Sequence, residues 1–242
     1  MLLQVGYTHA NWIYAGKIQK NIISYDFTSS YPYVMLSEKY PMSEFKKCNI
    51  KSHLQLLDNL AYLIHVKLFN VSCKYFNNFI SQSKCIKIKK GRYDNGRIIS
   101  AEEIEIILTD IDFKFLLKTY DFEYTFIECY YSIKNYLPVE LINFILDKYI
   151  KKTELKNVIG YETEYMLQKN LFNSIYGMCV TNNIRNDVLF DNKEWKDKIL
   201  TNEEIIYLLK EEKEKAFLSF SWRCFCNSLC KKKFARMFIS VR

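Results

Sequence analysis

Asp26 stands where a carboxylate could hold a metal ion with phosphate bound beside it. It follows the apolar segment 21–25, which is typical of a strand, and a helix-start pattern comes next. Ser29 and Ser30 precede Pro32 there. Carboxylate oxygen suits Mg²⁺, and the free N–H groups of a helix N-terminus suit phosphate. One segment could therefore supply both functions, although taken alone it fits a plain strand, turn and capped helix better.

A second segment places a cation, an amide and an aromatic ring on one face of a predicted helix. Lys169, Asn173 and Tyr176 follow a spacing of four and then three residues, so their side chains share a face. The apolar residues left for packing are Leu171, Phe172 and Ile175. Gly177 would end the helix as a C-cap. Lysine can meet phosphate and a ring can support a base, but an ordinary amphipathic helix explains this segment better when it is taken alone.

Together, and in this order, the two segments resemble motif A (DxxSLYP) and motif B (KxxxNSxYG) of the family B DNA polymerases. The residues that match motif A are Asp26, Ser29, Tyr31 and Pro32, and the usual Leu is replaced by Ser30. Motif B is matched in full by Lys169, Asn173, Ser174, Tyr176 and Gly177. The resemblance implies an α+β fold, in which a palm of mixed or antiparallel sheet with helices carries fingers made of a helical hairpin.

The resemblance also implies DNA-directed DNA synthesis with two Mg²⁺ ions. Asp26 would be the catalytic carboxylate that ligates the metal ions, and the backbone carbonyl of Phe27 would assist it. A primer 3′-OH would attack the α-phosphate of a deoxynucleoside triphosphate. In protein priming, the first acceptor would be a hydroxyl group of a protein.

Other residues of the two motifs would hold the nucleotide, again by resemblance. Tyr31 would be the steric gate that rejects a ribose 2′-OH, and Lys169 would bind the triphosphate. The rest of the nucleotide site would consist of Phe27, Ser29, Ser30, Asn173 and Tyr176. We expect DNA contacts from Ser174, Gly177, Lys231, Lys232, Lys233 and Arg236. For the basic residues of this set, a solvated helix face is an equally good interpretation.

Three features resemble the protein-primed branch of the family, which is found in phages, linear plasmids and organellar elements. The interval between Asp26 and Lys169 has room for the insertion that contacts a terminal protein in that branch. The polar stretch 182–214 occupies the place of the branch's second insertion. Gly6-Tyr7-Thr8 resembles the end of its YxGG segment, although Leu3 and Val5 stand where Tyr and the first Gly would be. The expected partners are template–primer DNA, deoxynucleoside triphosphates and a terminal protein.

Two-metal transfer needs a second carboxylate, which the family supplies in a YxDTDS segment called motif C. No such segment follows Gly177 in the 242 residues, although 220–238 resembles the helix that normally precedes it. Asp110-Ile111-Asp112 resembles motif C in miniature but lies before motif B. We therefore expect Asp112 to be structural, with Thr109 or Asp110 as a helix cap. The sequence predicts an incomplete polymerase that is inactive alone; the alternative is a non-catalytic basic module that binds DNA or a terminal protein.

The predicted organisation has five parts. The start of the palm with motif A is expected at 1–43, and the palm with the first insertion at 44–137. The fingers with motif B are expected at 138–181. The second insertion follows at 182–216 and the last palm helix at 217–242. Within them, hydrophobic periodicity predicts strands at 61–69, 84–90 and 103–108. It predicts helices at 32–39, 112–120, 139–150, 161–176, 202–210 and 217–241.

Composition favours a folded protein with an anionic partner. Hydrophobic residues make up 49% of the chain, while Gly (6) and Pro (3) are too scarce for a disordered linker. The net charge of +8 suits nucleic acid, and the alternating basic strand 84–90 is a candidate for phosphate contact. No apolar run could cross a bilayer and no signal peptide is recognisable, so we expect a cytoplasmic protein. Of the eight cysteines, Cys224, Cys226 and Cys230 cluster without a nearby His, which favours helix packing over a metal site.

Overall fold

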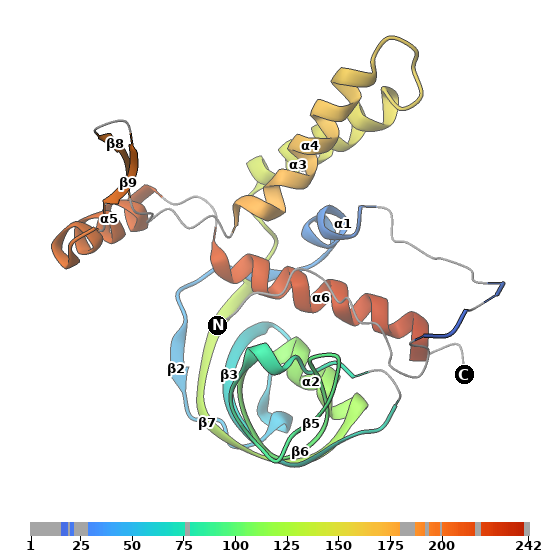
Figure 1. Ribbon diagram of the computed structural model, residues 1–242, viewed down its shortest axis with the longest axis vertical. Coiled ribbons are helices and arrows are strands. Elements are labelled where there is room, and N and C mark those ends of the chain that lie inside the picture. Colours follow the sequence, from blue (N-terminus) through green and yellow to red (C-terminus); the bar gives the residue numbers. More distant parts are fainter. Residues whose placement is uncertain are drawn as a thin grey trace.

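The computed structural model describes residues 16–18, 20–21, 29–75, 78–179, 187–191, 194–198, 200–215 and 219–239. Asp26, Phe27 and most of the strand expected at 21–25 lie outside these residues. The architecture is α+β, as predicted, with a curved sheet at one end and a helical hairpin at the other (Figure 1). None of the described helices is long and apolar enough to cross a membrane.

The main sheet has seven strands, and every pairing in it is antiparallel. The strands run in the order β1-β7-β3-β6-β4, with β2 added to β7 and β5 added to β6. Their bounds are β1 Tyr40–Pro41, β2 Lys46–Cys48, β3 Leu60–Cys73, β4 Cys85–Lys89, β5 Arg92–Asp94, β6 Arg97–Thr109 and β7 Tyr120–Asn135. Two 3₁₀ turns lie between strands, at His53–Gln55 and Gln82–Lys84.

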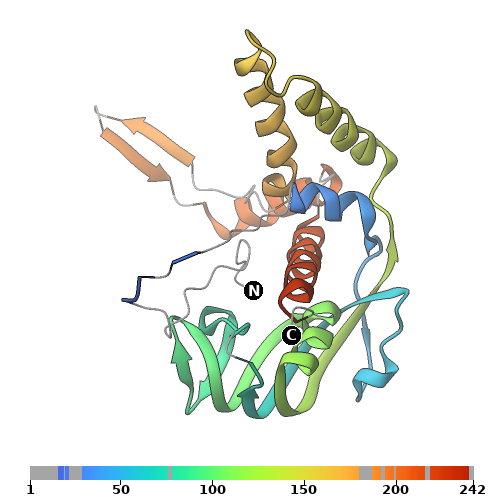
Figure 2. The same ribbon diagram turned by 90° about the vertical axis from the view of Figure 1, so that its right-hand side faces the viewer.

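Alternating side chains put one face of this sheet into a core. Ile64, Val66 and Leu68 of β3 are fully buried, and the residues between them are partly exposed. Helix α2 (Asp110–Thr119) lies in the concave side of the sheet (Figure 2) and contributes Phe113 and Phe115 to the same core. Burial of these apolar side chains drives the packing of sheet and helix.

The remaining helices build a second core beside the first. The four helices that matter for the site are α1 Ser30–Ser37, α3 Val139–Glu154, α4 Glu162–Met178 and α6 Phe220–Ile239. Helices α3 and α4 form the projecting hairpin, and α6 lies between α1 and the sheet (Figures 1 and 2). Phe172 of α4 and Phe225 of α6 are buried in this core with Val34 of α1. A separate hairpin consists of β8 Asp187–Asp191 and β9 Glu194–Lys198, and helix α5 follows it at Asn202–Lys215.

The sequence reading missed the longest strand and misplaced one helix end. Strand β7 was not predicted, although aromatic residues alternate with polar ones along Tyr120–Phe126. Gly177 is not a C-cap, because α4 continues to Met178 and Cys179 takes the cap position. The alternation expected along the strand 84–90 is also wrong in part. A register shift between Cys85 and Lys87 leaves the apolar side chain of Ile86 exposed.

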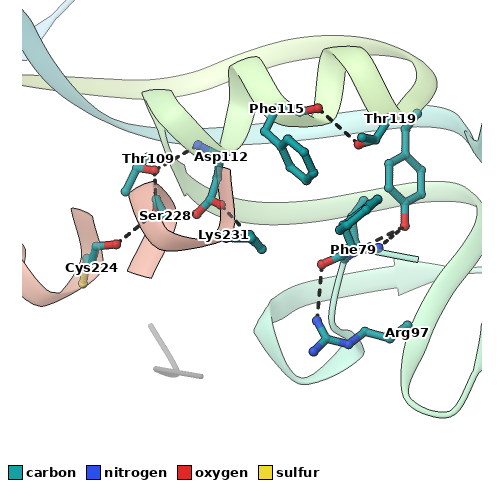
Figure 3. A network of polar contacts seen from close by, with 11 residues as sticks. Phe79, Arg97, Thr109, Asp112, Phe115, Thr119, Cys224, Ser228 and Lys231 are labelled. Atoms are coloured by element: carbon teal, nitrogen blue, oxygen red, sulfur yellow. Dashed lines mark hydrogen bonds and ion pairs between the residues drawn. The ribbon is translucent and has the colours of Figure 1, made fainter. Parts of the chain in front are cut away.

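A buried polar cluster joins α2 to α6 (Figure 3). The Thr109 hydroxyl accepts a hydrogen bond from the Asp112 backbone N–H (3.1 Å), which confirms the predicted cap. The Asp112 carboxylate accepts hydrogen bonds from Ser228 Oγ (2.7 Å) and from Lys231 Nζ (2.9 Å). Asp110 pairs with Lys134 at 3.0 Å. Both acidic residues of the Asp-Ile-Asp sequence are therefore structural, in agreement with the prediction for Asp112.

The Asp112–Lys231 pair should contribute to stability in a pH-dependent way. Burial acts to raise the pKa of Asp112, but Lys231, Lys84 and the Ser228 hydrogen bond outweigh it and hold the pKa below its usual value. Asp112→Ala leaves Lys231 without its partner, so we expect the free energy of unfolding to fall by about 3 kcal/mol at pH 7. The wild-type advantage should persist above about pH 4 and disappear as the pH falls through the folded-state pKa.

Urea denaturation of wild type and variant at several pH values measures both effects. Asp121→Ala is the matched control, because Asp121 is 75% exposed and pairs with Lys74 at the surface. This control should cost about 1 kcal/mol or less. Equal losses in the two variants would contradict the structural role of Asp112.

Candidate nucleotide site

The helix that follows motif A begins at a strained residue that a lysine holds from across the chain. Ser29 has φ 53° and ψ 46°, the left-handed region that L-residues rarely occupy. Its side chain does not cap α1; instead its Oγ accepts a hydrogen bond from Lys152 Nζ of α3 at 2.9 Å. The first helical residue is Ser30, so Pro32 lies in the first turn rather than at its first position. The turn before α1 is thus held by the α3–α4 hairpin.

Two cysteines of α6 contact the start of α1. Cys230 Sγ donates to the Ser30 backbone oxygen at 3.7 Å and accepts from Ser30 Oγ at 3.5 Å. Cys226 Sγ donates to the Tyr31 backbone oxygen at 3.8 Å. These weak contacts and the burial of Cys226 agree with the predicted packing role of the cysteine cluster. They hold the first turn of α1 against α6.

Tyr31 and Tyr176 bring the two motifs into direct contact. Their rings stack with centroids 3.9 Å apart and planes inclined by 15°. The guanidinium carbon of Arg223 lies 4.4 Å from the centre of the Tyr176 ring, and the Tyr176 hydroxyl donates a hydrogen bond to Asn227 Oδ1. Burial raises the pKa of both tyrosines, so both hydroxyls stay protonated at neutral pH. Residues predicted separately for sugar and base therefore form one surface.

Two lysines lie on the hairpin side of this surface. Lys169 Nζ lies 6.0 Å from the Tyr165 ring centre. Lys152 Nζ lies 4.8 Å from the Phe172 ring centre. Burial, followed by the positive charge of Lys169, lowers the pKa of Lys152. An anion bound near Lys152 would favour the protonated form of this lysine, which burial and the charge of Lys169 disfavour.

The other predicted residues of motif B, Asn173, Ser174 and Gly177, are all exposed. Asn173 is exposed, as a residue that meets a ligand would be. Ser174 is also exposed, but its hydroxyl donates to the Leu171 backbone oxygen at 2.8 Å. The Gly177 backbone oxygen accepts from Arg223 at 3.5 Å, and a Cβ placed on Gly177 would meet no atom within 4 Å. Nothing in the described residues requires glycine there, and contacts of Ser174 and Gly177 with DNA stay a prediction.

The basic cluster of the last helix points in different directions. Lys231 pairs with Asp112, while Lys233 contacts Glu38 at 3.1 Å and lies over the Tyr33 ring at 4.2 Å. Lys232 lines a cavity of about 1190 Å³ between α1, α2 and α6. The side chain of Arg236 lies outside the described residues. These lysines do not form a single phosphate-facing row, and their contact with DNA remains a prediction.

The predicted metal ligands lie outside the described residues, because Asp26 and Phe27 are not among them. The described part of the chain contains no group of three His, Cys, Asp or Glu side chains that could hold a metal ion. Ser29, three residues after Asp26, is described, and its hydrogen bond with Lys152 places the end of motif A next to α3.

Sequence reasoning missed three residues that complete this site: Lys152, Arg223 and Asn227. Lys152 lies in a polar joint between predicted helices, where one lysine among several carries no signal. Arg223 is the one charged residue in the largely apolar run 216–226, and this isolated charge could have marked it as a residue with a specific partner. Asn227 has no signal in the sequence, because its role depends on how α4 and α6 are packed.

The fold and the contact between the two motifs define a DNA polymerase-like domain. The sequence matches the family described as DNA polymerase type B, organellar and viral, over residues 6–219, and the chain belongs to this family. A search of curated protein sequences finds no significant match.

Among solved structures, the chain is similar to the Phi29 DNA polymerase. Its complex with primer–template DNA gives a TM-score of 0.58 at 16% identity, covering 84% of this chain and 32% of that one. An orthorhombic crystal form gives 0.55 at 16% identity, covering 86% and 34%. The complex with DNA and incoming nucleotide gives 0.51 at 19% identity, covering 72% and 30%. This chain spans about a third of the length of those polymerases, and the likeness concerns the fold.

The cysteine contacts predict an unusual order of thiol reactivity. A hydrogen bond with Cys226 and another with Ser30 lower the pKa of Cys230 against the effect of burial, while the same contact raises the pKa of Cys226. Burial raises the pKa of Cys224 to about 12 and that of Cys179 to about 11. At pH 8, iodoacetamide should therefore modify Cys230 before the other three.

Peptide mapping by mass spectrometry gives the order directly. Ser30→Ala should slow modification of Cys230 because it removes one hydrogen bond to the thiolate. If Cys224 or Cys179 reacts first in the folded chain, the arrangement around Ser30 is wrong.

Proposed function

We propose that this chain forms the nucleotide-binding part of a DNA polymerase active site that transfers deoxynucleotides to a primer 3′-OH. The observation that carries the proposal is the stack of Tyr31 on Tyr176. The two residues belong to different motifs, far apart in the sequence, and each motif has a nucleotide role by resemblance. Their contact is what one site built from both motifs requires.

In this proposal the deoxynucleoside triphosphate lies along the start of α1. The free N–H groups of α1 and the ammonium groups of Lys152 and Lys169 bind the phosphates. Tyr31 lies against the sugar, where a 2′-OH would collide with its ring. Asn173 and Tyr176 face the base. The adjacency of Ser29, Lys152 and Lys169 supports this orientation.

Asp26 holds Mg²⁺ in this proposal, with the backbone carbonyl of Phe27 beside it. The metal neutralises phosphate charge and activates the primer 3′-OH when it is bound. Two-metal transfer needs a second carboxylate; the 242 residues contain no motif C to supply it, and Asp110 and Asp112 are already paired with lysines. The chain alone should therefore bind nucleotide and DNA without extending a primer.

Primer–template DNA is the proposed macromolecular partner, and protein priming is the proposed mode of initiation. The net charge of +8 supports binding to DNA. The length of chain between motif A and motif B is what supports a terminal-protein contact, because by resemblance the protein-primed branch carries its first insertion there. Lys89 and Lys90 of this sheet pair with Glu103 and Glu102, so the basic strand alone does not account for DNA affinity.

Lys169→Ala should weaken binding of a deoxynucleoside triphosphate about tenfold to a hundredfold, since a charge-assisted phosphate contact contributes about 1.5–3 kcal/mol. Lys152→Ala should weaken binding as well, and it also frees Ser29. Isothermal titration calorimetry of the chain with dATP and Mg²⁺ measures both effects. Lys210→Ala, an exposed lysine on α5, is the matched control. A loss below about twofold for Lys169→Ala would mean that this lysine is only a solvated helix residue.

Asp26→Asn should abolish the Mg²⁺ dependence of dATP binding while the fold is kept, because the amide loses the charge that holds the cation. Titrations with Mg²⁺ and with EDTA compare the two conditions, and circular dichroism checks the fold. Asp121→Asn, at an exposed carboxylate, should keep the dependence. Unchanged Mg²⁺ dependence in Asp26→Asn would rule out the metal role.

A further inference from the structure

Tyr176 joins motif A to α6 through two different contacts. Its hydroxyl donates a hydrogen bond to Asn227 Oδ1 of α6. Its ring stacks on the ring of Tyr31, with centroids 3.9 Å apart and planes inclined by 15°. Asn227 is half-buried and belongs to neither motif.

Contacts on the ring faces leave one movement of Tyr176 unrestrained. Tyr31 packs on one side of the ring at 3.9 Å, and Arg223 lies 4.4 Å from its centre. Such contacts fix the plane of a ring, but they do not by themselves fix the position of the hydroxyl oxygen within that plane. A hydrogen bond is directional. The contact with Asn227 is therefore the one that fixes where the Tyr176 hydroxyl stands.

The position of Tyr31 depends on that of Tyr176. The two rings are stacked with centroids 3.9 Å apart, so a displacement of the Tyr176 ring changes the surface on which the Tyr31 ring packs. Tyr31 also starts from a strained turn, because Ser29 before it has a positive φ. Its side chain needs an external anchor, and Asn227 supplies that anchor through Tyr176.

We propose that Asn227 is a positioning residue for sugar selection, which acts by holding the Tyr176 hydroxyl and through it the Tyr31 ring. This inference rests on the proposed function. In the proposed function, Asn227 contacts neither the sugar nor the phosphates of the nucleotide. Its effect is on the ratio of affinities for ribonucleotide and deoxynucleotide, rather than on triphosphate affinity in general.

The test is a double-mutant cycle on the full chain with dATP and ATP as probes. Asn227→Leu keeps the approximate volume and removes the acceptor. It should narrow the ratio of the two dissociation constants about fivefold, the effect of about one neutral hydrogen bond. Tyr176→Phe should narrow the ratio to a similar extent. The double variant should narrow it no further than the single variants, because both remove the same contact.

Two controls separate positioning from general damage. Asn227→Asp keeps an acceptor oxygen and should keep the wild-type ratio. Asn143→Leu makes the same exchange at an exposed position of α3 and should leave the ratio unchanged. The role of Asn227 is wrong if the wild-type chain selects dATP and Asn227→Leu leaves the ratio of the two dissociation constants unchanged. It is also wrong if the effects of the two single variants add in the double variant.

Urea unfolding of the same variants keeps the inference testable when folding is impaired. The unfolding midpoints of Asn227→Leu and Tyr176→Phe should both fall, and that of the double variant should fall no further than the lower of the two. Additive shifts would overturn the contact itself. If the wild-type chain binds neither nucleotide, both the proposed function and the sugar-selection role are wrong. Non-additive shifts of the urea midpoints would then still support the hydrogen bond between Tyr176 and Asn227.

Discussion

The packing of α6 is the constraint on which the rest of the structure depends. Its buried face meets α1 through Cys226, α2 through Ser228 and the motif B helix through Arg223. Trp222 Nε1 also donates to the Pro41 backbone oxygen at 2.9 Å, which fixes β1. One helix thus sets the positions of both motifs and of the sheet. A shift of α6 would move Tyr31 and Tyr176 together.

Much of the fold could be predicted because its elements carry strong local signals. The alternation in β3 and β6 and the helical spacing in α3 and α4 are set by burial of one face, which is visible in the sequence. The resemblance of the two motifs assigned Tyr31 and Tyr176 to one nucleotide site, but it did not predict that their rings would stack. No local pattern could have produced that contact, since the two residues are brought together only by the packing of α1 against α4.

Other parts of the site depend on partners that a local pattern does not reveal. Lys231 looked like a surface cation, yet its charge is directed to Asp112 because α2 and α6 cross there. Gly177 looked like a helix stop, yet α4 continues to Met178, and Cys179 at the cap position is buried in the core that also contains α6 residues. Asn227 became visible only when its distant partner was in place. In each case tertiary packing decided between two readings that were locally equivalent.

The pairing of β1 with β7 has a consequence for how this domain can vary. Tyr40 lies opposite Asn135 and Pro41 opposite Lys134, so the chain leaves for the sheet and returns from it at adjacent points. The sheet has its own core around Ile64 and Phe113, distinct from the core that holds the two motifs. A segment with a closed base and an independent core can be lengthened, shortened or exchanged during evolution without changing the distance between the residues on either side of it.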